Sequence, residues 1–197
     1  MAKQIAKVRA HRRARAYAHR RARTRRAAVD PRKPARAPGN VRTEVGAVRV
    51  SESFRGSVHE AETCWNDTSR WPQWVDELAH VVSVEGDWPR QGAVVRWQSG
   101  PAGRGRVTER VIEHEPLQGY TVEVEDDSIT GEQSVVFDPA EDGVEVTLAL
   151  NYRIKRRSPL TPLVDVLFVR RLMITSLEKT LGGFGAVLAE SRRSGVG

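Results

Sequence analysis

The chain has 197 residues, of which 39% are hydrophobic, and this is enough for one domain with one core. Its single cysteine, Cys64, excludes an internal disulfide bond and fits a reducing compartment. No apolar run is long enough to span a membrane, because Arg170 and Arg171 interrupt the best candidate, and no apolar signal segment follows the basic N-terminus. We therefore expect a cytoplasmic protein without integral membrane association.

The positive charge is concentrated at the N-terminus. Residues 1–39 hold 14 Lys and Arg and one acid, Asp30, for a formal charge of +13, whereas the rest holds 18 basic and 24 acidic residues, a net −6. Clustered like charges without an apolar stripe predict a disordered tail and a proline-containing linker over residues 1–40. A nonspecific phosphate-binding arm for nucleic acid is one interpretation. A solvated extension, or translated sequence upstream of the true start, is the favoured one.

Hydrophobic alternation begins at residue 45. Val48 and Val50 mark a first strand. Ser57 and Glu60 then match a capping box, in which each side chain serves the backbone N–H of the other residue. This motif predicts a short helix that ends at about Asn66.

A second short helix and six further strands follow. Ser69 is a candidate N-cap for the helix, which tolerates Pro72 in its first turn. Turn-forming residues separate the strands, which are predicted over residues 79–85, 93–98, 105–115, 120–125, 132–137 and 144–154.

The segment from Thr161 to Glu190 shows the periodicity of a long helix, and Thr161 followed by Pro162 is a typical helix start. Its apolar stripe consists of Val166, Val169, Met173, Leu177, Leu181, Phe184 and Leu188. Gly182 and Gly183 permit either a bend or a close backbone approach. Because such a stripe needs a covering surface, we predict an α+β fold in which an antiparallel sheet curls around this helix.

Several of these features together resemble one known family. They are the capped helix after the first strand, the segment Asp67–Trp74 with its Trp-Pro-Gln-Trp run, Gly92 opening a strand, the run Val-Ile-Glu-His-Glu-Pro at 111–116, and the C-terminal amphipathic helix. Over about residues 45–190 the chain resembles the START-like superfamily called SRPBCC, in its polyketide cyclase/dehydrase and lipid-transport branch.

The resemblance implies a helix-grip fold, in which a curved sheet of six to seven strands and two short helices close over the long helix and leave an apolar cavity. It implies a ligand-binding domain over residues 41–192, followed by a disordered C-terminus at 193–197. Members of the superfamily include ligand carriers, aromatases and cyclases, hydrolase-like activators and coenzyme Q-binding proteins, and the fold alone does not choose among them.

Strand parity predicts which side chains face the long helix. In 93–98 the inward set includes Trp97, and in 105–115 the same rule places Glu109 inside. The candidate ligand-contacting residues are Trp97, Glu109, Tyr120, Gln133 and Tyr152 on strands and Met173 and Leu177 on the helix. Inward Trp and Tyr are also ordinary core residues, and Glu109 at a strand end would lie in water. Both interpretations stay open.

Other chemistry has weaker signals. His59, His80 and His114 lack metal-ligand spacing, so no metal site is predicted, and His114 is expected to be exposed. Cys64 is expected to be a packed residue and not a nucleophile. The glycine-rich run 100–105 lacks the context of a phosphate-binding loop and predicts a hairpin turn.

The sequence favours a protein that binds a hydrophobic small molecule, such as a lipid, polyketide or quinone, without a cofactor. No Ser/His/Asp set is visible, so the residues do not support catalysis. The enzyme alternative is a polyketide cyclase or dehydratase in which Glu109 is the general acid/base and Tyr120 assists, and this needs a raised pKa in a dry pocket. A second alternative is a nucleic-acid or ribosome-associated protein acting through residues 1–39.

Overall fold

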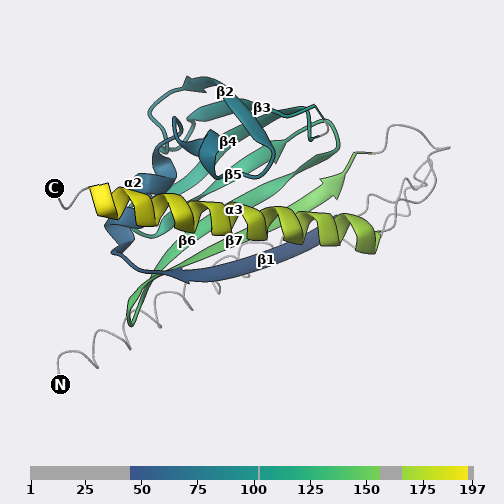
Figure 1. Cartoon of the computed structure of the whole chain (residues 1–197). Helices are drawn as coiled ribbons and strands as arrows, with labels where there is room; N and C mark the ends of the chain where they lie inside the picture. The colour runs from purple at the N-terminus through teal and green to yellow at the C-terminus, as the bar shows by residue number, and fades with distance from the viewer. Residues whose placement is uncertain (1–44, 102, 156–165, 195–197) are drawn as a thin grey trace, which may run out of the picture. The chain divides into compact units, whose positions relative to one another are not determined.

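The computed structural model describes residues 45–101, 103–155 and 166–194. Seven strands form one antiparallel sheet in the order β1-β7-β6-β5-β4-β3-β2 (Figure 1). The elements are β1 (Val45–Phe54), α2 (Val58–Asn66), the 3-10 helix η1 (Trp71–Gln73), β2 (Leu78–Glu85), β3 (Val94–Ser99), β4 (Arg106–Glu115), β5 (Gly119–Glu125), β6 (Ile129–Ala140), β7 (Gly143–Ile154) and α3 (Val166–Ser194). The predicted α+β helix-grip fold is confirmed. The basic tail, the linker and the helix start at Thr161 and Pro162 lie outside the described residues.

Helix α3 runs across one face of the sheet (Figure 1). The C-terminal part of its predicted stripe is buried, namely Leu177, Leu181, Phe184 and Leu188, while Val169 and Met173 are half-buried and pack against the same core. The stripe is therefore confirmed from Val169 onward. The side chain of Val166 lies outside the description.

Gly183 permits a close approach between α3 and η1. A Cβ atom at this position would lie 2.8 Å from the carbonyl oxygen of Trp74, whereas one at Gly182 would meet nothing within 4 Å. The position of Gly183 therefore leaves no room for a side chain. Of the two roles that the sequence left open, Gly183 has the close backbone approach.

The capping box of α2 forms as predicted. Glu60 N donates to Ser57 Oγ at 3.2 Å, and Ser57 N donates to Glu60 Oε2 at 2.6 Å. The helix ends at Asn66, as expected.

The second short helix forms with Pro72 in its first turn, as predicted, but the expected cap by Ser69 is wrong. Ser69 does not cap a helix, because its N–H and its hydroxyl both donate to Asp67 Oδ1, at 3.1 and 2.5 Å. Asp67 thereby closes a local turn, and the chain then forms only the three-residue η1, whose N-terminus has no side-chain cap. The helix ends at Gln73, and Trp71 and Trp74 are both buried.

An aromatic cluster around Trp65 joins α2, η1, the sheet and α3. The Trp65 ring centroid lies 4.6 Å from that of Trp74, 4.9 Å from that of Phe184 and 6.1 Å from that of Phe137. Its carbonyl oxygen also accepts from Trp71 Nε1 at 2.9 Å. Such ring pairs add about 0.5–1.5 kcal/mol beyond their buried area. The cluster fixes the two short segments against the end of α3.

Leu181 and Leu172 test the packing of α3 with a matched pair on one helix. Leu181 is 1% exposed and Leu172 is 49% exposed. Leu181→Ala should lower the free energy of unfolding by about 2–5 kcal/mol, because it removes buried contacts and leaves a cavity. Leu172→Ala should change it by no more than about 0.5 kcal/mol. Urea denaturation measures both, and equal effects would contradict the packing of α3 described here.

Candidate functional site

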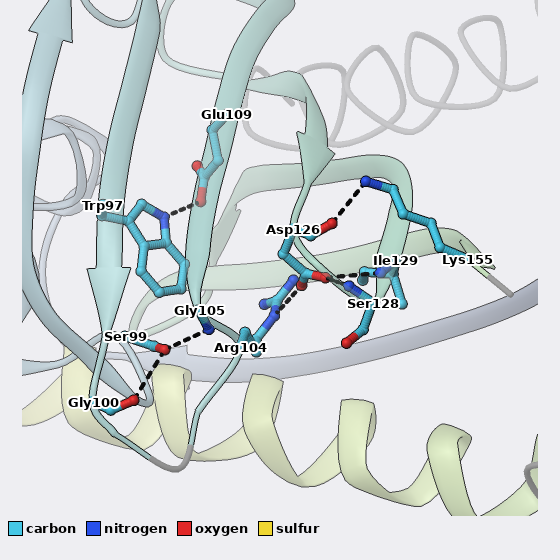
Figure 2. A network of polar contacts seen from close by, with 10 residues as sticks. All are labelled: Trp97, Ser99, Gly100, Arg104, Gly105, Glu109, Asp126, Ser128, Ile129 and Lys155. Atoms are coloured by element: carbon cyan, nitrogen blue, oxygen red, sulfur yellow. Dashed lines mark hydrogen bonds and ion pairs between the residues drawn. The ribbon is translucent and has the colours of Figure 1, made fainter. Parts of the chain in front are cut away.

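A buried carboxyl group lies on the inner face of the sheet. Glu109 on β4 stands opposite Val95 on β3, two residues from Trp97, so both side chains point to the same face. Trp97 Nε1 donates to Glu109 Oε1 at 2.9 Å (Figure 2). Glu109 is 7% exposed and Trp97 is 2% exposed. The alternative that Glu109 sits in water at a strand end is therefore wrong.

The surroundings of Glu109 favour its neutral form. Loss of hydration on burial raises the pKa of Glu109, and this outweighs the opposing effects of the Trp97 hydrogen bond and the Arg104 charge. A carboxyl group in this state keeps its proton at a higher pH than an exposed one. It can both accept and donate a hydrogen bond.

Tyr120 places a second proton donor near Glu109. Its hydroxyl oxygen accepts from Trp65 Nε1 at 2.9 Å, which leaves the hydroxyl hydrogen available for donation. Burial raises the pKa of Tyr120 well above its ordinary value, and the nearby Glu109 adds to this while Trp65 opposes it. The phenol therefore stays protonated under all physiological conditions.

A polar network closes one end of this region (Figure 2). Asp126 follows β5, and its side chain is fully buried. Its Oδ1 accepts from Ser128 N and Ile129 N at 2.6 and 2.7 Å, while its Oδ2 accepts from Arg104 Nε at 2.7 Å. The carboxylate thus fixes the β5–β6 turn and holds Arg104.

The β3–β4 hairpin determines where Arg104 lies. The predicted turn over residues 100–105 is confirmed, because β3 and β4 pair on either side of it. Gly105 N donates to Ser99 Oγ at 2.8 Å, and the Ser99 hydroxyl donates to Gly100 O at 3.2 Å. The guanidinium carbon of Arg104 then lies 5.9 Å from the Trp97 ring centroid, within range of a cation–π contact.

The structure brings together only part of the predicted set. Trp97 and Glu109 are joined by a hydrogen bond, and the charge of Glu109 acts on Tyr120, whose pKa it helps to raise. Gln133 is half-buried on the inner parity of β6, opposite Leu150. Tyr152 is buried on β7. No described contact joins Gln133 or Tyr152 to Glu109.

Tyr152 belongs to a different part of the inner face. Its ring fills the space that a side chain at Gly46 would need, since a Cβ there would lie 2.3 Å from the ring. Burial raises the pKa of Tyr152, while Arg170 on α3 lowers it in part. Its buried hydroxyl has no hydrogen-bond partner among the described residues. Met173 and Leu177 are half-buried and buried on α3, where their contact with a ligand remains a prediction.

Sequence reasoning missed three residues of this site. Arg104 lies in the predicted turn, Asp126 follows a predicted strand, and Trp65 lies in the first predicted helix, and none of the three was among the candidate residues. The Asp-Asp-Ser run at 126–128 is the one signal that could have indicated Asp126, because Asp commonly accepts from backbone N–H groups two and three residues later.

His114 is also less exposed than predicted. Only 16% of its side chain is exposed, and its Nε2 lies 4.0 Å from Glu62 Oε1. Glu62 on α2 covers this strand end, and its Oε1 accepts from Leu117 N at 2.9 Å. A contact between distant parts of the chain therefore overrides the local expectation of a solvated strand end.

A separate groove of about 710 Å³ opens on the surface between the end of β1 and the C-terminal part of α3. Its lining comprises Ser53, Phe54, Arg55, Gly185, Leu188, Ala189, Arg192 and Arg193. None of the predicted ligand-contacting residues lines it.

Within the described ranges, no group of three or more His, Cys, Asp or Glu side chains is arranged to hold a metal ion. The same part of the chain contains no helix that is long and apolar enough to cross a membrane.

A family model described as "Polyketide cyclase / dehydrase and lipid transport" matches residues 45–189. The chain belongs to this family. The match covers every described strand and most of α3. A search of curated proteins finds no match.

Solved structures of low sequence identity share the fold. A Staphylococcus aureus protein of unknown function has a TM-score of 0.64 at 14% identity, covering 78% of this chain and 99% of that one. The di-domain ARO/CYC StfQ from the steffimycin biosynthetic pathway has 0.61 at 17%, covering 77% and 52%. Norcoclaurine synthase from Thalictrum flavum has 0.59 at 13%, covering 77% and 99%. At these identities the likeness shows the fold alone.

The raised pKa of Glu109 predicts a specific pH dependence of stability. The unfolded chain loses this proton near pH 4.5, the ordinary value for Glu, whereas the folded chain keeps it to higher pH. The associated stability is therefore complete below about pH 4.5 and declines as the pH rises through the folded pKa. Glu109→Gln cannot ionise and should lack this decline.

Urea denaturation of both proteins between pH 4 and pH 8 measures the effect. Relative to wild type, the variant should gain about 1.4 kcal/mol for each pH unit between the two pKa values. The exposed Glu123 on β5 provides a control, and Glu123→Gln should run parallel to wild type. A pH-independent difference between Glu109→Gln and wild type would show that Glu109 ionises normally.

Proposed function

We propose that this domain binds an apolar small molecule between the sheet and α3, with its polar group against Glu109, Trp97 and Tyr120. The observation that carries this proposal is the buried Glu109 carboxyl on the inner face. Its described hydrogen bond uses only Oε1, so the second carboxyl oxygen is left for a ligand. Family membership supports the same conclusion, because lipid transport and polyketide conversion both act on largely apolar molecules.

The residues around this group favour an apolar ligand. Those that flank Glu109 on the inner faces of β3, β4 and β5 are buried valines, namely Val95, Val107, Val111, Val122 and Val124. A ligand with several charged groups would lose its hydration there without compensation. A lipid, a polyketide or a quinone has one or two polar atoms on an apolar body. Such a molecule can place its polar atoms against Glu109 and its apolar part against the valines.

Native mass spectrometry of the purified full chain with lipid and quinone extracts tests the proposal. We expect the protein to retain a bound molecule, seen as added mass, and we expect an added apolar probe to compete with that molecule for binding. Val122→Asp places a charge among the valines and should abolish retention, while the exposed Glu123→Gln should not change it. A circular dichroism spectrum checks that the Asp variant still folds. Retention of every mass by a folded Val122→Asp variant would overturn the interior site.

A second candidate function is proton transfer to a bound ketone by Glu109, as in a polyketide cyclase or dehydratase. The specific observation in its favour is a buried carboxyl group whose pKa is raised, near a buried phenol, since a general acid must hold its proton at the working pH. The fold shared with StfQ, described as an ARO/CYC from a biosynthetic pathway, is consistent with this role.

Glu109→Gln separates a carrier from an enzyme. The amide keeps the size and polarity of the carboxyl group, so affinity for a neutral ligand should change by no more than about 1 kcal/mol in either case. If Glu109 is the general acid, turnover should fall by roughly 10²-fold or more. A binding titration and a turnover assay on the same variant distinguish the two. Turnover that survives the substitution would remove Glu109 as the catalyst.

A further inference from the structure

Arg104 has a buried donor that no described residue uses. Its Nε is paired with Asp126, but its Nη2 is buried without a hydrogen-bond partner. The side chain as a whole is 19% exposed. Leaving a buried charged group without a hydrogen bond costs more free energy than leaving a neutral group unpaired. Such a donor indicates a partner that arrives from outside the protein.

The guanidinium group adjoins the inner site. It lies 5.9 Å from the Trp97 ring centroid, and its charge lowers the pKa of Glu109 against the effect of burial. Figure 2 shows the group between the Asp126 carboxylate and the Trp97–Glu109 pair. The unused donor is therefore part of the polar end of the proposed ligand site.

Arg104 and Lys155 at this end each have a carboxylate partner. Arg104 is paired with Asp126, and Lys155 Nζ donates to Glu125 Oε1 at 2.6 Å and to Asp126 O at 2.7 Å. A ligand anion would lose its hydration and lie near the buried Asp126 carboxylate, which repels it. A neutral oxygen would satisfy Nη2 without that cost.

We propose that Arg104 determines ligand specificity by donating from Nη2 to a neutral carbonyl oxygen of the bound molecule. This inference rests on the interior ligand site proposed above and adds to it the chemical group that is recognised. It favours an apolar ketone or ester over a hydrocarbon of the same shape, and over the corresponding carboxylate.

Three naphthalenes of nearly equal size test the inference by isothermal titration calorimetry on the full chain. They are 2-acetylnaphthalene, 2-ethylnaphthalene and 2-naphthoate. Wild type should bind the ketone roughly tenfold or more tightly than the hydrocarbon, as expected for a hydrogen bond from a charged donor. Arg104→Met keeps an apolar stem without a donor and should bring this ratio close to one. Affinity for the hydrocarbon should stay unchanged.

Two further variants keep the test decisive. Because Arg104→Met leaves the Asp126 carboxylate without its cation, a double variant also carries Asp126→Asn. The Asn side chain is neutral, and its oxygen can still accept the hydrogen bonds from the backbone of the β5–β6 turn. Arg110→Met, at an exposed position on β4, should retain the wild-type ratio.

The outcomes separate the two proposals. Equal binding of ketone and hydrocarbon by wild type, or a ratio that Arg104→Met leaves unchanged, would overturn the role of Arg104 while the interior site stands. Tightest binding of the carboxylate would overturn the recognition of a neutral oxygen. Failure of wild type to bind any of the three would overturn the interior site itself.

Discussion

Burial of the inner face of the sheet against α3 is the interaction on which the other features depend. The inward residues of β7, from Val144 to Leu150, are at most 1% exposed, and Leu181, Phe184 and Leu188 of α3 are equally buried. Each such side chain contributes about 1.5–3 kcal/mol. Because side chains alternate along a strand, this burial fixes the orientation of every residue in the paired strands, including the polar ones. Val107 and Val111 lie two residues before and after Glu109 and are buried, so they fix the Glu109 side chain on the inner face.

The same burial sets the chemistry of the polar residues. A carboxyl group in a low-dielectric interior is stable only when neutral or strongly hydrogen-bonded, and Glu109 has a single indole N–H from Trp97. Asp126 is the contrasting case, because two backbone N–H groups and Arg104 stabilise its negative charge. Two acids within one network therefore differ in their number of donors. The carboxyl with fewer donors, Glu109, is the one whose pKa burial raises.

The sequence predicted interactions between residues that are close in the chain better than interactions between residues that are far apart in it. The capping box of α2 and the inward direction of Glu109 follow from spacings of three and two residues, and both are correct. Ser69 has an equally local signal, but Asp67 competes for its hydroxyl, and no rule of spacing decides between two such partners. Arg104 lies in a turn without periodicity and pairs with a residue 22 positions away. The direction of the Arg104 side chain depends on the folded sheet, because only the sheet brings Arg104 and Asp126 together.

The surface groove and the inner site offer very different environments for recognition. Arg55, Arg192 and Arg193 line the groove, where water screens their charges, and Arg192 already lies 3.4 Å from Glu60. On the inner face the polar groups are few and surrounded by apolar side chains, so each hydrogen bond to a ligand discriminates more strongly. A leucine in place of Glu109 would avoid the cost of burying a carboxyl group, and a partnered donor in place of Arg104 Nη2 would avoid another. Glu109 and Arg104 both contact Trp97, through its Nε1 and its ring, so a molecule bound as proposed above would meet both polar groups next to one indole.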